Sequence, residues 1–116
     1  MDEKLRQTYL FDFYGELLNP HQRRLYEDYC SNDLTISEIA VEEGISRQAV
    51  AEMIKRCRAK LEGYESKLHL LERFLSVRTK VGSMRSLAQG MTDDPAACAV
   101  LAEQMIAILD QILEEL

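Results

Sequence analysis

Apolar residues recur every three to four positions along most of the chain, which is the spacing of one face of an α-helix. The first such stretch predicts a helix over residues 3–18. Its expected apolar row is Leu5, Tyr9, Phe13 and Leu17, with Leu10, Tyr14 and Leu18 beside it. Asn19-Pro20 then joins a strong N-cap to a residue favoured at the first helical position, so a second helix is expected over 20–31. No segment shows the period-two alternation of a strand, and the predicted fold class is all-α.

Residues 34–61 predict two helices joined by a tight turn. Thr35 and Glu38 have the spacing of a capping box at the start of a helix over 36–43. Gly44 is placed to end that helix in the left-handed conformation, and Ser46 is placed to cap the next one. This pattern predicts a helix-turn-helix, a motif whose second helix enters the DNA major groove.

The second helix of this pair has an apolar seam that continues well past the motif. The seam residues are spaced alternately four and three apart and are Val50, Ile54, Cys57, Leu61, Tyr64, Leu68, Leu71 and Leu75. A continuous helix from Arg47 to Ser76 would be about 45 Å long at a rise of about 1.5 Å per residue. A three-helix domain cannot cover so long a stripe, so the lower half of the seam is predicted to pack against the C-terminal segment or a second subunit. Gly63 is the position where a kink is most expected.

The periodicity weakens after residue 76, which divides the chain into a helix-turn-helix domain over 1–76 and a C-terminal helical extension over 77–116, expected to serve in dimerisation. A short helix is expected around residues 81–88. Asp94-Pro95 repeats the signature of a cap followed by proline and predicts a last helix over 95–115. The apolar row of that helix is Leu101, Met105, Ile108 and Ile112.

The chain carries a net charge of −6, which argues against a general nucleic-acid binder, but the charge is unevenly distributed. Residues 1–43 carry net −6, residues 44–80 carry net +5, and residues 81–116 carry net −5. The basic segment contains the second helix of the motif, as a nucleic-acid reader requires. The alternative is a solvated basic helix face balanced by acidic neighbours.

Several classes of protein are not expected. No uninterrupted apolar run reaches the roughly 18 residues of a membrane span, and the charged N-terminal stretch does not resemble a signal peptide, so we expect a cytoplasmic protein without membrane insertion. Cys30, Cys57 and Cys98 are widely separated and form no metal-ligand pattern with His21 and His69, so no metal is expected. No phosphate-binding loop, dinucleotide fingerprint or nucleophile elbow is present, so neither an enzyme nor a cofactor is expected.

Helical periodicity places a set of polar residues opposite the seam at the start of the second motif helix. Arg47 and Gln48 lie in the first turn, where such helices contact base edges, and these side chains can bond guanine and adenine. Glu52 can accept a hydrogen bond from cytosine but is repelled by phosphates. The full set of candidate DNA-contacting residues is Ser46, Arg47, Gln48, Ala51, Glu52, Lys55, Arg56 and Arg58.

These motifs together resemble a known family. The segment TISEIAVEEGISRQAVAEMIKR resembles the helix-turn-helix of region four of bacterial sigma factors. Combined with LFDFYGELL, HQRRLYEDYCSNDL and LEGYESKLHLLERF, it is similar to the YlxM family of small bacterial proteins encoded beside components of the signal recognition particle. The resemblance covers residues 3–76 and is loose beyond them.

The resemblance implies an all-helical DNA-binding regulatory protein, dimeric, with a role in the signal recognition particle pathway. Ser46, Arg47, Gln48, Lys55 and Arg56 are the motif positions that would contact DNA. Two alternatives stay open. One is an accessory factor that binds the particle's RNA or its GTPase subunit, and the other is a purely structural interaction protein.

Overall fold

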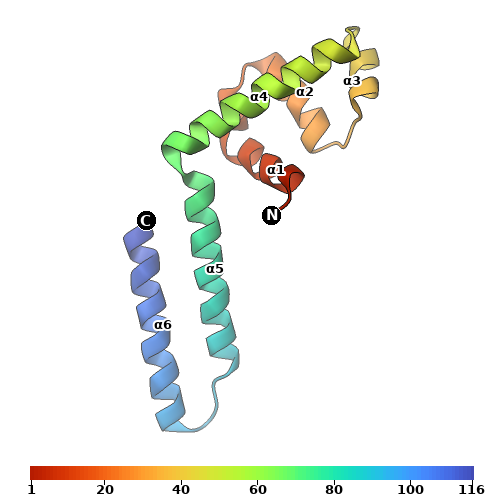
Figure 1. Ribbon diagram of the computed structural model, residues 1–116. Coiled ribbons are helices and arrows are strands. Elements are labelled where there is room, and N and C mark those ends of the chain that lie inside the picture. The colour runs from red at the N-terminus through yellow and green to blue at the C-terminus, as the bar shows by residue number, and fades with distance from the viewer. The chain divides into compact units, whose positions relative to one another are not determined.

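The computed structural model describes residues 1–116 and contains helices but no strand, which confirms the all-α prediction (Figure 1). The elements are α1 (Glu3–Tyr14), a 3₁₀ turn η1 (Gly15–Leu17), α2 (Pro20–Cys30), α3 (Ile36–Glu43), α4 (Arg47–Leu68), α5 (Leu70–Gln89) and α6 (Pro95–Glu115). They form two compact units, Met1–Leu71 and Glu72–Leu116. The sequence pattern placed this division after residue 76.

The N-terminal unit is built around α4, which contacts α1, α2 and α3 (Figure 1). Its core contains buried residues from three of these helices: Leu25 and Tyr26 from α2, Ile39 and Ala40 from α3, and Val50, Ile54, Cys57 and Leu61 from α4. Each buried aliphatic side chain contributes about 1.5–3 kcal/mol. Burial of these rows therefore holds the four helices together.

The apolar row predicted for the first helix is only partly the buried one. Leu10, Tyr14 and Leu18 are buried, whereas Leu5, Phe13 and Leu17 are exposed. The true core row begins at Gln7, which is 2% exposed and stands three residues before Leu10. Because Gln7 is polar, the spacing of hydrophobic residues alone does not show that this row is the buried one.

Helix α4 is long, as expected, but it does not continue to Ser76. His69 adopts the left-handed conformation (φ 57°, ψ 29°) and ends α4, while Gly63 lies within the unbroken helix. The predicted seam is thereby divided. Its first four members are buried, Tyr64 is half-buried, Leu68 is exposed, Leu71 is buried and Leu75 is half-buried on α5. The part from Val50 to Leu61 is covered by this chain's own helices rather than by a second subunit.

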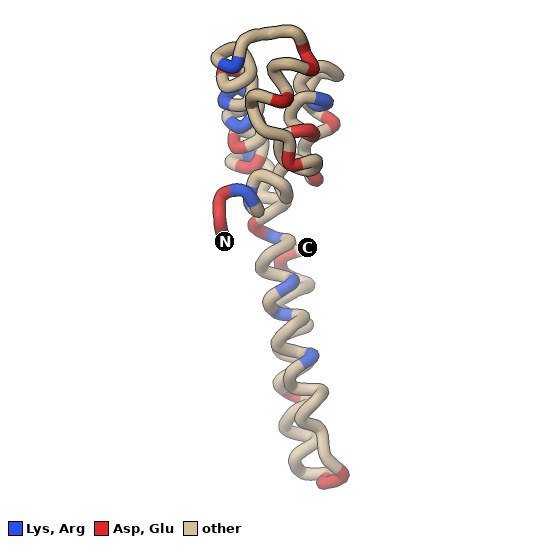
Figure 2. Tube along the Cα trace, turned by 90° about the vertical axis from the view of Figure 1, so that its right-hand side faces the viewer, with Lys and Arg blue, Asp and Glu red and all other residues tan.

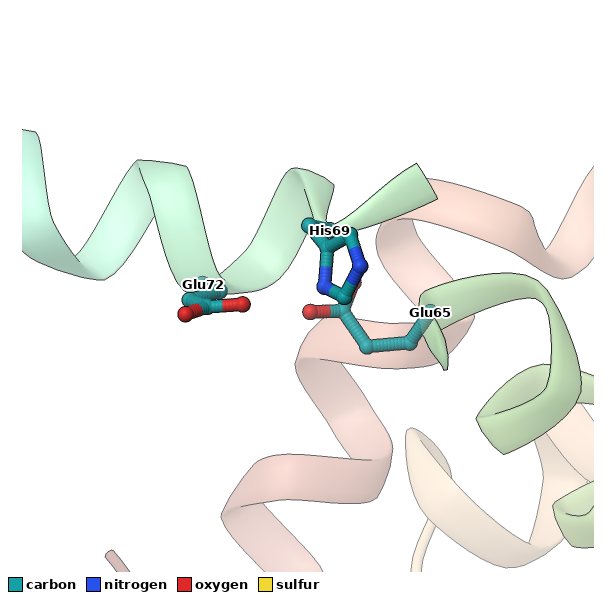
Figure 3. Close-up of side chains that lie close together, drawn as sticks. All are labelled: Glu65, His69 and Glu72. Carbon is teal, nitrogen blue, oxygen red and sulfur yellow. The ribbon is translucent and has the colours of Figure 1, made fainter. Parts of the chain in front are cut away.

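A buried carboxylate explains why the helix ends where it does. Glu65, 6% exposed, accepts hydrogen bonds from the Tyr14 hydroxyl at 2.6 Å and from the Leu71 backbone N–H at 2.9 Å. The Tyr14 hydroxyl also accepts from the Leu70 N–H at 3.1 Å. Figure 3 shows Glu65 extending from α4 toward the chain that follows His69. These bonds satisfy backbone donors at the start of α5 that would otherwise be orphaned.

A second polar cluster joins α1, α2 and α4. Arg6 binds Glu62 through two hydrogen bonds, of 2.9 and 2.7 Å, and Gln7 donates to the same carboxylate at 3.0 Å. The Tyr26 hydroxyl, which is buried, donates to the Gln7 side-chain oxygen at 2.9 Å. The hydrogen bond from Arg6 holds the pKa of Glu62 below its usual value of 4.5. The buried polar atoms at the helix junction therefore have partners.

The C-terminal unit is a hairpin of α5 and α6, which run side by side in opposite directions (Figure 1). The short helix expected around residues 81–88 is instead the second half of the 20-residue α5. The caps of α6 are as predicted, since the Asp94 side chain accepts from the Ala96 N–H. Glu115 on α6 accepts a hydrogen bond from Ser76 at 2.8 Å and forms an ion pair with Lys80, both on α5.

Helix α6 is long and apolar enough to cross a membrane by length and composition, with mean hydropathy 1.6 over its most apolar window. This differs from the expectation drawn from uninterrupted apolar runs. Core helices of soluble proteins share the property, but only 6% of the window is buried here.

We expect Tyr14→Phe to destabilise the protein by about 1–3 kcal/mol, because it removes one hydrogen bond to the buried Glu65 carboxylate and the side-chain acceptor of the Leu70 N–H. Tyr64→Phe is the matched control, since the Tyr64 ring is half-buried 6.0 Å from that of Tyr14 but its hydroxyl takes no part in this network. Urea denaturation followed by circular dichroism measures both variants. Equal stability of the two would contradict the assigned role of Glu65.

We expect the stability contributed by Arg6 and Glu62 to depend on acid pH. Because the pKa of Glu62 is lowered in the folded protein, this contribution is present above the usual value of 4.5 and is lost as pH falls through the lower folded value. Arg6→Gln should therefore flatten the fall in melting temperature below that pH. Lys4→Gln, which removes an exposed ion pair with Asp33, should leave the profile nearly unchanged.

Candidate nucleic-acid interface

The turn between α3 and α4 is fixed by local hydrogen bonds. Thr35 and Glu38 form the predicted capping box, in which the Glu38 N–H donates to the Thr35 hydroxyl at 3.1 Å and the Thr35 N–H donates to the Glu38 carboxylate at 3.2 Å. Gly44 ends α3 with φ +68° and ψ +31°, and its N–H donates to carbonyls of α3. These residues form the helix-turn-helix that their spacing predicts.

The first turn of α4 is capped from within the motif. The Ser46 hydroxyl accepts a hydrogen bond from the Ala49 N–H at 3.0 Å and leaves its own hydrogen free to donate. Behind this turn Val50 is fully buried, which fixes the rotation of α4 about its axis. Ile45, in the turn itself, is 37% exposed.

Seven of the eight candidate DNA-contacting residues are exposed at the start of α4, and Gln48, Glu52, Lys55 and Arg56 lie opposite its buried row. We name them the α4 surface: Ser46, Arg47, Gln48, Ala51, Glu52, Lys55 and Arg56. They come from three successive turns at the start of one helix, the part that reaches base edges in a helix-turn-helix. The set combines three cations, one carboxylate, one amide, one hydroxyl and one small apolar side chain.

Arg58 departs from the sequence expectation. It is half-buried, and its Nε atom is buried without a hydrogen-bond partner. Its electrostatic neighbours are Tyr26, Tyr29 and Glu3, on α1 and α2. The side chain therefore lies against the core of the unit, because position 58 is one residue past the buried Cys57 and not opposite it.

The basic charge of residues 44–80 is more dispersed than the linear count indicates. Only Arg47, Lys55 and Arg56 contribute to the α4 surface. Lys60 donates to the Gln22 side chain at 3.0 Å, and the remaining basic residues lie further along α4 or on α5. Figure 2 shows these positions spread along the chain. The local charge of the α4 surface, including Glu52, is +2.

Helix α3 presents a second exposed surface beside the α4 surface. Glu38, Val41 and Glu42 are exposed, with 85% of Val41 accessible. A shallow apolar hollow of about 400 Å³ lies between α3 and the start of α4. It is lined by Ser37, Ala40, Val41, Gly44, Ile45 and Arg47. Glu43 is turned away from this surface and binds His21 at 3.0 Å and Arg24 at 3.6 Å on α2. Apolar spacing does not reveal this hollow, because Val41 belongs to no predicted apolar row and Ile45 lies in the turn.

The thiol of Cys57 faces the core rather than the α4 surface. Burial raises its pKa to about 11, so it is a neutral thiol at physiological pH. Burial also raises the pKa of the Cys30 thiol. Both cysteines therefore act as small apolar core residues.

Comparison with known proteins identifies the family. Residues 1–94 match the family described as "Putative helix-turn-helix protein, YlxM / p13 like". The chain belongs to this family. The YlxM protein of Bacillus subtilis is 38% identical over 101 residues, covering 87% of this chain and 92% of that one. A relative in Shouchella clausii is 47% identical over 85 residues, covering 73% and 78% of the two chains.

Membership of the YlxM family agrees with the geometry of α3 and α4. A third relative, in Oceanobacillus iheyensis, is 50% identical over 74 residues, which cover 64% of this chain and 70% of the relative. The description of the family names the helix-turn-helix that α3 and α4 form here. Its match ends just before α6, so it includes the whole motif and all of the α4 surface.

Two glycines test the turn geometry. We expect Gly44→Ala to destabilise the protein by about 1–2 kcal/mol, because alanine is strained at φ +68°. Gly63→Ala is the matched control: it lies in mid-helix with no atom within 4 Å of an added Cβ, so it should stabilise by about 0.5–1 kcal/mol. Thermal and urea denaturation measure both. A neutral Gly44→Ala would mean that the turn has another conformation.

Proposed function

We propose that this YlxM-family protein is a cytoplasmic DNA-binding regulatory protein that inserts the start of α4 into the major groove. The observation that carries the proposal is the α4 surface, seven exposed side chains at the start of a helix whose other face is buried. Because the packed row fixes the helix, these side chains are preorganised for a groove. A helix-turn-helix presents its second helix to DNA in this way.

Each residue of the α4 surface has a role that fits its chemistry. Arg47 can bond the O6 and N7 atoms of guanine, and Gln48 the N6 and N7 atoms of adenine. Ala51 is small enough to approach a thymine methyl group. Lys55 and Arg56, further along the helix, suit phosphates, and the Ser46 hydroxyl can also donate to one.

Glu52 makes the proposed interface selective. A carboxylate beside phosphates is repelled, which weakens binding to arbitrary sequences. The same group accepts a hydrogen bond from the amino group of cytosine in the major groove. With a local charge of only +2, the α4 surface should therefore bind non-specific DNA weakly and depend on base contacts.

We expect Lys55→Ala to weaken binding to all DNA sequences about equally and to reduce the slope of log K against log salt by about one. Lys67→Ala is the matched control, because Lys67 is an exposed lysine on the last turn of the same helix, outside the α4 surface. Fluorescence anisotropy with a selected binding site, titrated between low and moderate salt, measures both.

Arg47→Ala separates base reading from phosphate contact in the same assay. The variant should lose about 1–3 kcal/mol of discrimination at one base pair. This loss should exceed the loss of affinity for DNA in general. The DNA proposal fails if selection from a random DNA pool enriches no sequence and low-salt titrations show no binding.

We also propose that the protein acts as a homodimer, since two-fold helix-turn-helix proteins bind paired half-sites about one helical turn apart. The helix-turn-helix unit itself leaves no long seam for a partner, because the row from Val50 to Leu61 is covered. We therefore propose that self-association involves the C-terminal extension.

The second candidate function is an accessory factor of the signal recognition particle that binds its RNA or its GTPase subunit. It is favoured by one observation: Glu38, Val41 and Glu42 form an acidic and apolar surface on α3, where DNA phosphates would be repelled. Pull-down with the particle's RNA and its GTPase subunit tests it. Capture of either, lost with Val41→Glu but kept with Lys55→Ala, would favour this function over DNA binding.

A further inference from the structure

The C-terminal hairpin leaves most of its apolar surface uncovered. Within Glu72–Leu116 only Ile112 is buried. Helix α6 carries an inner row that faces α5, formed by Leu101, Met105, Ile108 and Ile112. A second row lies beside it, spaced alternately four and three apart, and we name it the α6 open row: Ala102, Ile106, Leu109, Leu113 and Leu116. The four large members are 57, 44, 69 and 85% exposed.

Helix α5 has the same organisation. Its half-buried inner row toward α6 contains Ser76, Lys80, Met84 and Leu87. Its exposed apolar positions recur every seven residues, and we name them the α5 open row: Phe74, Val81 and Ala88. A heptad spacing of this kind is typical of a helix that packs against another helix.

Both open rows lie on one side of the hairpin. At about 100° per residue, the open row of each helix is rotated by about a quarter turn from its inner row, in the same sense. Because the helices run in opposite directions, equal rotations bring both open rows to the same side. Glu115, which binds Ser76 and Lys80, is rotated in the other sense. The result is one continuous apolar face.

The two edges of this face carry opposite charges. Arg78 and Arg85, seven residues apart, border the α5 open row. Glu103, Asp110 and Glu114 border the α6 open row, and α6 contains no basic residue. Figure 2 shows that the basic positions of the hairpin follow one another along its length. A partner that fits must be apolar in the centre, acidic along one edge and basic along the other.

We propose that this face binds the same face of a second copy, forming a four-helix bundle in which α5 of each chain lies over α6 of its partner. The proposal rests on the homodimer proposed above and names its contact surface. A two-fold axis parallel to the helices brings the arginines of one α5 beside the acidic edge of the partner's α6. The other face-to-face arrangement, α5 over α5, would bring like charges together.

A second copy also supplies what the hairpin lacks. Two helices that bury one side chain between them gain too little apolar burial to offset the cost of ordering 45 residues. Packing two hairpins face to face covers both open rows and completes a core of four helices, an arrangement with antiparallel neighbours throughout. A bilayer would cover the apolar centre but would not match the opposite charges of the two edges.

Light scattering coupled to size exclusion tests the surface with the full chain. We expect twice the 13.3 kDa monomer mass at micromolar concentration, and monomer for the double variant Leu109→Glu and Leu113→Glu. Val100→Glu is the matched control, because Val100 is 56% exposed on the opposite side of α6, and it should remain dimeric. A monomeric wild type, or a double variant that stays dimeric, overturns the proposal.

Charge reversal tests the pairing and does not depend on the apolar core. Variant A carries Arg78→Glu and Arg85→Glu, and variant B carries Glu103→Lys, Asp110→Lys and Glu114→Lys. Each alone should dimerise roughly tenfold more weakly than wild type, and the mixture should form a heterodimer of near wild-type affinity. If variant A alone dimerises as well as wild type, the arrangement of α5 over the partner's α6 is wrong.

Two further outcomes separate this inference from its alternatives. Dimers that bind no DNA would leave the inference intact and defeat the proposed function, whereas monomers that bind DNA through Lys55 would do the reverse. Co-sedimentation of a monomeric wild type with vesicles of phosphatidylglycerol and phosphatidylcholine, lost in the Leu109 and Leu113 double variant, would assign the face to a membrane and overturn the proposal.

Discussion

Burial of one face of α4 is the constraint on which the N-terminal unit depends. Helices α1, α2 and α3 all contact α4, and Val50, Cys57 and Leu61 are completely buried among them. Because an α-helix has about 3.6 residues per turn, fixing this face also fixes the direction of the opposite one. The packing that stabilises the domain therefore orients Arg47, Gln48 and Lys55 toward solvent. Core and candidate interface are two faces of a single helix.

The two ends of α4 are determined in different ways. Its start is set by neighbours in sequence, the left-handed Gly44 and the hydroxyl of Ser46. Its end is set by tertiary contacts, in which Tyr14 from α1 and Glu65 from α4 bind the first backbone N–H groups of α5. A buried carboxylate requires such partners, because desolvation of an unpaired charge is costly. His69 takes a conformation unusual for a residue with a Cβ atom, and these hydrogen bonds compensate for its strain.

Acidic and basic side chains of this acidic chain are concentrated on different helices. Glu43 lies 3.0 Å from the His21 ring and pairs with Arg24, and Glu62 pairs with Arg6, so these acids are directed away from the α4 surface. The exposed acids of α3 remain beside it and limit how much non-specific attraction it can exert on phosphates. In the C-terminal unit the two helices carry opposite charge. This separation is the feature that distinguishes one way of pairing two chains from the other.

The sequence by itself determined the helices and their starts, because caps and turns are local. Thr35 with Glu38, Gly44, Ser46, Asn19-Pro20 and Asp94-Pro95 each act within a few residues, and the structure has each of them in the expected role. The same reasoning identified the buried row from Val50 to Leu61 and seven of the eight candidate contact residues as exposed.

Tertiary structure alone decided where α4 ends, which row of α1 is buried, and that Arg58 lies against the core. The heptad pattern continues unchanged through Leu68 and Leu71, so no local signal marks the break at His69. Gln7 and Glu65 occupy core positions at helical spacing from Leu10 and Leu61, but polar residues are assigned outward unless their partners are known. Those partners, Tyr26 and Tyr14, are 19 and 51 residues away in sequence, and only folding brings them together.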